Sequence, residues 1–190
     1  MGKKGITTRD EDTVVDVFTA STHDYILFFT DMGKVHLRKG YQIPEAGRTA
    51  RGTAIVNVLP LEAGESVTAM VITREFDDNE FLMMVTKKGT VKRIPFIALK
   101  TNRKAGIRAI TLEDGDHLIN VIRTGGNDDI LLATAQGMAI CFNENDVRPM
   151  GRDAAGVRGI SLSEGDFVVG AEKAEAGKTL LTLTVNGYGK

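Results

Sequence analysis

An internal repeat of about fifty residues is the feature of this sequence that most constrains its fold. Residues Ala105–Asp116 (AGIRAITLEDGD) and Ala155–Asp166 (AGVRGISLSEGD) match in register, fifty positions apart. A looser copy, Ala50–Glu65, fits when about three residues are inserted after its glycine. A period of this length is typical of solenoids and propellers, in which each unit buries its apolar faces against its neighbours.

A stretch that predicts a β-hairpin precedes each copy of the repeat, and a further such stretch follows the last copy. In each one an apolar run reaches a polar residue and then a glycine, which tolerates the positive φ of a tight turn. Two more apolar stretches follow within a unit, such as Ile107–Leu112 and Leu118–Ile122, so we expect about four strands per unit. The four predicted hairpins are Tyr25–Val35, Phe81–Val91, Ile130–Ala139 and Leu180–Tyr188.

Polar connections separate the hairpins from the later strands, and their length and composition predict exposed loops. They are Gly40–Arg51, Ile97–Lys104 and Asn143–Ala154. The best helical candidate, around Pro95–Lys100, is short, so the predicted fold class is all-β and propeller-like, with four-stranded blades of about fifty residues. A strand is also expected at Val14–Phe18, where it would complete a further blade.

These patterns divide the chain into a short linker and a partial propeller. The linker covers residues 1–11 and the propeller residues 12–190. The blade-like units are expected at about 12–73, 74–123 and 124–172, followed by an incomplete unit at 173–190.

Composition indicates a soluble globular protein. The chain has 190 residues, of which 42% are hydrophobic and 26% charged. No apolar run approaches the roughly 20 residues of a membrane helix, and the first residues lack the apolar segment of a secretory signal. We therefore expect a cytoplasmic protein with no membrane partner. Cys141 is the only cysteine, and it is expected in the core.

Charge is segregated along the chain, although the formal net charge is only −1. Residues 87–108 contain eight Lys or Arg and no acidic residue, and a second basic stretch covers residues 34–51. Acidic residues are concentrated between and after these stretches. The overall balance would argue against a nucleic-acid partner, but the segregation allows a basic surface.

No constellation of residues predicts catalysis, a metal or a cofactor. The histidines, His23, His36 and His117, lack metal-ligand spacing. Gly177–Thr179 resembles the end of a phosphate-binding loop, but Glu172 stands where that motif requires glycine. Five of the eight phenylalanines lie in apolar strand runs, which favours core packing over base stacking: Phe28, Phe29, Phe81, Phe142 and Phe167.

Several ordered motifs together closely resemble the C-terminal domain of the DNA gyrase A subunit. They are Gly47–Gly52 (GRTARG) with Val58–Glu62 (VLPLE), Gly156–Ile160 with Glu164–Asp166, and Thr184–Lys190 (TVNGYGK). The resemblance runs from about Asp12 to Lys190. At Gly2–Ile6 the sequence departs from the family's Gln-Arg-Arg-Gly-Gly-Lys-Gly box, because the leading Gln-Arg-Arg is missing and Lys3 replaces a glycine.

The resemblance implies a β-pinwheel, a propeller variant with strands exchanged between neighbouring blades, that binds and bends duplex DNA. It further implies that the chain has no catalytic residue of its own. It would work with two other parts of the enzyme, namely the ATPase-bearing B subunit and the cleavage core of the A subunit. The resemblance also implies that the domain binds DNA non-specifically and wraps it to support ATP-dependent negative supercoiling. Because the family needs its box for wrapping, the incomplete box within residues 1–11 leaves open whether this chain wraps DNA productively. Two alternatives stay open: the corresponding domain of the topoisomerase IV A subunit, and a protein-interaction propeller.

Backbone recognition of DNA needs Lys and Arg spaced along a surface. The first unit offers Lys34, Arg38, Lys39, Arg48 and Arg51, and the second offers Lys87, Lys88, Lys92, Arg93, Lys100, Arg103, Lys104 and Arg108. The third unit has Met138, Ile140 and Phe142 in its second strand, so weaker contact is expected from its remaining candidates, Arg148, Arg152 and Arg158.

Overall fold

The computed structural model describes residues 14–47 and 50–190, and within them it contains only β-strands, short 3-10 turns and loops. The first hairpin is β1 (Tyr25–Thr30) and β2 (Lys34–Lys39); the second is β4 (Phe81–Thr86) and β5 (Thr90–Pro95); the third is β8 (Asp129–Thr134) and β9 (Ala139–Asn143). The remaining strands are β3 (Val67–Thr73), β6 (Ile107–Arg108), β7 (Leu118–Thr124), β10 (Val157–Arg158) and β11 (Val168–Ala174). The predicted all-β class is confirmed.

The three hairpins turn at the glycines that the sequence indicates. Gly33, Gly89 and Gly137 have φ of 77°, 84° and 85°, a region open to glycine at little cost. In each turn the glycine amide donates a hydrogen bond to the backbone oxygen of the threonine that ends the first strand. Antiparallel pairing then runs the full length of each hairpin.

Strand exchange links each unit to the one before it. The sheets have the orders β3-β1-β2-β6, β10-β5-β4-β7 and β11-β8-β9. Thus β6, which lies in the second unit of the sequence, pairs with β2 of the first sheet, and β10 of the third unit pairs with β5 of the second. The expectation of four strands per unit holds for the first two sheets only, and there the fourth strand comes from the next unit.

Apolar side chains fill the space between successive sheets. Alternation along β4 sends Leu82 and Met84 toward the first sheet, where they join the cluster of Leu27 and Phe29. Met83 and Val85 point the other way and pack with residues of the third sheet, such as Ile130 and Leu132. Both faces of the central sheet are therefore buried, which fixes the order of the three sheets.

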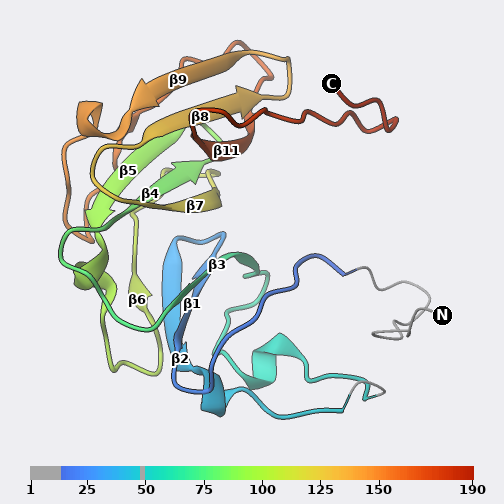
Figure 1. Cartoon of the computed structure of the whole chain (residues 1–190), viewed down its shortest axis with the longest axis vertical. Helices are drawn as coiled ribbons and strands as arrows, with labels where there is room; N and C mark the ends of the chain where they lie inside the picture. The colour runs from blue at the N-terminus through green and yellow to red at the C-terminus, as the bar shows by residue number, and fades with distance from the viewer. Residues whose placement is uncertain (1–13, 48–49) are drawn as a thin grey trace.

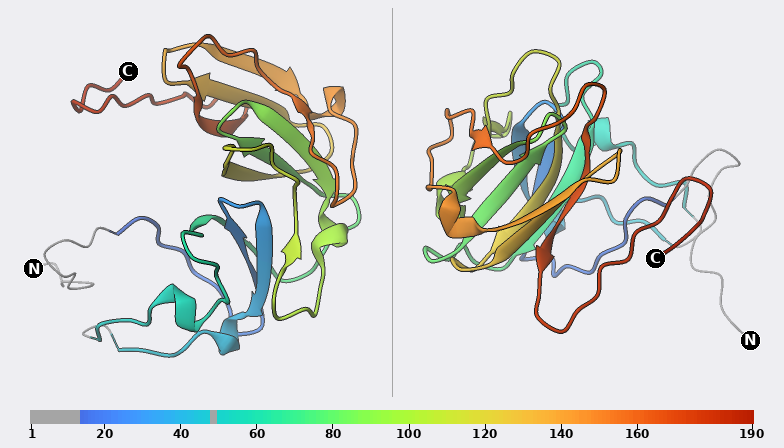
Figure 2. Two further views of the ribbon diagram at one scale, coloured as in Figure 1. Left: turned by 180° about the vertical axis from the view of Figure 1, so that it is seen from behind. Right: turned by 90° about the horizontal axis from the view of Figure 1, so that it is seen from above.

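The sheets follow one another around an arc, with β3, β7 and β11 side by side along its inner edge (Figure 1). Because the sheet orders begin or end on these strands, β6 and β10 lie at the opposite, outer edge. The views from behind and above show the same succession of sheets (Figure 2). The connections that precede β6 and β10 thus run along the outside of the arc.

Four expectations about individual segments were wrong or only partly met. Residues 14–18 form no strand, and Val15 is 96% exposed, because no sheet edge in the described residues lies against them. Residues 107–112 are strand only at β6. Cys141 is exposed, because the outer face of β9 is uncovered. Residues 180–188 form a turn closed by backbone hydrogen bonds, but their apolar side chains are exposed.

Candidate nucleic-acid interface

The exposed outer edge of the arc carries seven of the sixteen predicted DNA-binding residues. Arg51, Lys87 and Lys88 are exposed, while Lys34, Arg38 and Lys39 are partly buried. Arg48 lies outside the described residues. The connections to the two exchanged strands and the strands themselves contribute the remaining exposed cations: Lys100, Arg103, Lys104, Arg108, Arg148, Arg152 and Arg158.

Arg108 and Arg158 occupy equivalent places on the two exchanged strands. Arg108 pairs in register with Lys34 of β2, and Arg158 pairs with Thr90 of β5. Both side chains are exposed at the outermost strand of a sheet. Both arginines were predicted from the sequence, but only the strand exchange places them beside the hairpin turn of the preceding unit.

Lys92 was predicted at the surface, and that prediction was wrong. Its side chain is fully buried, and its Nζ donates to the backbone oxygens of Ala109, Arg152 and Ala154 at 2.7, 2.7 and 2.9 Å. Burial lowers its pKa to about 8, an effect that the nearby Asp153 opposes. Lys92 faces the junction between units because the exchanged strand β10 and its connection cover β5.

Arg93 was also predicted at the surface and is 4% exposed. Its Nε lies 3.0 Å from Oε2 of the fully buried Glu144, and its guanidinium stacks 3.9 Å from the centre of the Phe81 ring. Glu144 also accepts hydrogen bonds from Thr124 Oγ1 and from the amides of Gly126 and Asp128. The pair fastens the third unit to the second, and nothing in the sequence around Glu144 distinguishes it from an exposed acid.

Two cations of the first hairpin are partly engaged within the protein. Lys34 forms an ion pair with Glu62. Lys39 donates to the backbone oxygen of His23 at 2.8 Å, and its Nζ lies 3.3 Å from the centre of the Tyr25 ring. Contacts of these lysines with phosphate would therefore replace internal ones.

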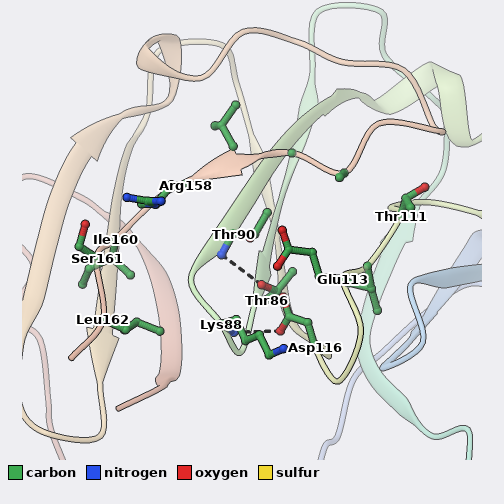
Figure 3. Close-up of a pocket in the computed structure, with 14 residues that line it drawn as sticks. Thr86, Lys88, Thr90, Thr111, Glu113, Asp116, Arg158, Ile160, Ser161 and Leu162 are labelled. Carbon is green, nitrogen blue, oxygen red and sulfur yellow. Dashed lines mark hydrogen bonds between the residues drawn. The ribbon is translucent and has the colours of Figure 1, made fainter. Parts of the chain in front are cut away.

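A cavity of about 620 Å³ lies between the second and third units, next to the outer edge (Figure 3). Of its two acidic side chains, Glu113 and Asp116, Asp116 is only 6% exposed and accepts hydrogen bonds from the amides of Lys88 and His117. Lys88 Nζ in turn donates to the backbone oxygen of Asp114. Asp116 and Lys88 thus shape the turns at the junction, which is a structural role.

The third unit has Met138 and Ile140 where the first unit has Lys34 and His36 and the second has Thr90 and Lys92, and of these His36 and Lys92 are buried. Met138 is 61% exposed and Ile140 37% exposed. Phe167, expected in the core, is 39% exposed, with Lys87 Nζ 4.8 Å from its ring centre. Weaker contact by the third unit stays a prediction.

Within residues 14–47 and 50–190, no group of three or more His, Cys, Asp or Glu side chains is placed to hold a metal ion. Among the same residues there is no helix long and apolar enough to cross a membrane.

Comparison with known families and curated proteins gives consistent results. Residues 1–21, 24–74, 80–124 and 128–175 match the family described as DNA gyrase C-terminal domain, beta-propeller. The DNA gyrase A subunit of Clostridium acetobutylicum is 48% identical over 80% of this chain and 18% of its own length. The DNA gyrase A subunit of Haloquadratum walsbyi is 47% identical, covering 100% of this chain and 23% of its own length. The chain therefore spans about a fifth of the length of these relatives.

Solved structures show the same likeness. The C-terminal domain of DNA topoisomerase IV has a TM-score of 0.82 at 27% identity, over 90% of this chain and 54% of that one. A DNA gyrase A C-terminal domain has a TM-score of 0.73 at 27% identity, with the same coverage.

Proposed function

The chain belongs to the family of DNA gyrase C-terminal domains, and from this premise we propose that it binds duplex DNA non-specifically along its outer edge, without reading base edges, and bends it there. The domain itself carries no catalytic residue in this proposal. It acts as a binding surface for a DNA topoisomerase.

The observation that carries this proposal is the position of the exposed arginines and lysines around β6. The exchange of β6 into the first sheet brings Arg108 to the outermost strand, directly after the connection that contains Lys100, Arg103 and Lys104. All four side chains are exposed. A band of positive charge on the convex side of an arc suits a polyanion that must curve around it.

Electrostatics favours backbone recognition here. Lys and Arg that neutralise phosphates release condensed counterions, so affinity arises without reading base edges. Bending favours sequences that deform easily, which gives preference through shape. The net charge of −1 is compatible with this mode because the positive side chains are gathered at one edge.

The parent enzyme in this proposal is a bacterial-type DNA gyrase working in the cytoplasm, because the curated relatives are gyrase A subunits. The domain would hold a duplex segment next to the cleavage core of the A subunit, while the B subunit supplies ATP hydrolysis. The high TM-score to the topoisomerase IV domain keeps that enzyme as the alternative parent.

A mobility-shift titration over a salt series tests the proposal, with a duplex of about 40 base pairs, long enough to follow the arc. The test variant combines Arg103→Gln, Lys104→Gln and Arg108→Gln. The control combines Arg74→Gln, Lys173→Gln and Lys178→Gln, which removes the same charge away from the outer edge.

If each replaced residue contacts a phosphate, the slope of log affinity against log salt becomes shallower by about 2.7 in the test variant. The control should keep the wild-type slope. Equal slopes in test and control variants would refute the assignment of the outer edge. Binding that is insensitive to salt would favour a protein-interaction role instead.

A further inference from the structure

The two connections that precede the exchanged strands share one contact. The backbone oxygen two residues before the glycine of each repeat accepts a hydrogen bond from a cation on the second hairpin strand of the preceding sheet. Arg38 Nη2 donates to Lys104 O at 3.1 Å, and Lys92 Nζ donates to Ala154 O at 2.9 Å. We call these two contacts the carbonyl latches.

The latch at Lys92 joins three segments. An ammonium group has three hydrogens to donate, and here all three have acceptors. Arg152 and Ala154 belong to the connection before β10, whereas Ala109 follows β6. The amide of Ala109 donates to Gly33 O in the first sheet. Lys92 therefore holds the second exchanged strand and the end of the first in one place.

The latch at Arg38 reaches the equivalent carbonyl from a different position. Counted from the turn glycines, the equivalent of Lys92 in the first hairpin is His36, whose two ring nitrogens are buried and have no hydrogen-bond partner in the structure. Arg38 lies two residues further on, on the same side of the strand. Its longer side chain reaches Lys104 O and also donates to Val58 O at 3.2 Å.

The exchanged strands need such support because they are short. Each pairs with its neighbour through only two residues. Two ladder positions give little cooperative hydrogen bonding for a segment that carries exposed arginines at its end. Charge-assisted hydrogen bonds are about twice as strong as neutral ones, and they act where the connection enters the strand.

We propose that Arg38 and Lys92 are positioning residues for DNA binding and are not themselves phosphate ligands. Arg38 holds the connection 100–106 so that Arg108 faces outward, and Lys92 holds the connection 150–156 so that Arg158 faces outward. The DNA half of this inference rests on the proposed function. The structural half, that Arg38 and Lys92 hold the two connections in place, depends only on the carbonyl latches and can be tested without DNA.

Amide hydrogen exchange on the full chain tests the structural half. In Lys92→Met, amides of residues 150–158 should exchange at least about tenfold faster, while those of residues 100–106 keep their protection. Arg38→Met should give the reverse pattern, and Arg38→Lys, which retains a cation, should restore much of the protection. If Lys92→Met does not fold, the two Arg38 variants carry the test, since that side chain is only partly buried. Unchanged exchange in the matching segment would overturn the proposal.

A salt series of duplex binding tests the DNA half, with Arg158→Gln as the matched control on the same strand pair. Lys92→Met should lower the affinity and make the slope shallower by no more than about 0.9, because the phosphate contact that it weakens is that of Arg158. Arg158→Gln should keep the exchange pattern and make the slope shallower by about 0.9. Adding Lys92→Met to Arg158→Gln should leave the slope of Arg158→Gln unchanged, and a further change of about 0.9 would identify Lys92 as a phosphate ligand and overturn the assignment. A wild-type chain that binds no DNA at any salt concentration would instead overturn the proposed function, and with it only the DNA half.

Discussion

Replacing Arg93 by methionine should destabilise the protein strongly, whereas replacing an exposed arginine of the outer edge should not. Arg93 is 4% exposed, and its partner Glu144 is fully buried. Removing one member of a buried ion pair costs about 3–5 kcal/mol, because the other charge stays buried without a partner. For a chain of this size the midpoint of thermal unfolding should fall by about 6–20 °C.

Urea and thermal unfolding measure this effect, with Arg103→Met as the control. Arg103 is exposed, so its replacement should change the free energy of unfolding by no more than about 0.5 kcal/mol. Adding Glu144→Gln to Arg93→Met should recover about 1 kcal/mol or more, since the buried side chain is then neutral. Glutamine retains an oxygen that can accept the amide hydrogens of the turn at residues 126–128.

A cost of less than about 1 kcal/mol for Arg93→Met would show that no buried unpaired charge had been created, and would refute the assigned role of Arg93. A shallower salt slope of DNA binding in the folded variant would also refute it, because Arg93 would then contact phosphate.

Three further predictions address the junctions and the uncovered edge of the third sheet. Burial is the main cause that lowers the pKa of His36, with Arg38 and Lys34 adding to it and Glu65 opposing it, so the unfolded chain binds a proton that the folded chain does not. Stability should therefore fall as the pH drops below about 6.5, by at most about 1.4 kcal/mol per pH unit, and His36→Met should remove this part of the slope in urea unfolding at several pH values. Gly156→Ala should destabilise more than Gly137→Ala in the same assay, by about 1 kcal/mol or more, because both glycines have positive φ but only the first would place its new Cβ 2.5 Å from a backbone oxygen, that of Val91. Cys141 should react with a thiol reagent in the folded protein nearly as fast as after unfolding, and slow reaction would show that its strand is covered in solution.

The sequence alone determined the fold class, the repeat and the turns. An apolar run of strand length that ends at a polar residue and a glycine predicts a hairpin from local sequence alone, because the strand preference of the run and the positive φ of the turn are properties of neighbouring residues. This is why the turns at Gly33, Gly89 and Gly137 agree with the structure. The repeat of fifty residues likewise determined that similar units pack in series.

Only the tertiary structure decided which sheet each later strand joins and therefore which cations are exposed. From the sequence, residues 107–108 could equally pair with a strand of their own unit. Strand exchange depends on which distant strand they pair with, and no local pattern encodes that partner. That choice covers β5 with the third unit, so Lys92 and Arg93 are buried while Arg103 and Arg108 stay exposed. The sequence shows that Lys and Arg are clustered, but it does not show which of their side chains are exposed. Exposure depends on what packs against each side of the strand, and here the packing segments lie about fifty residues away in the sequence.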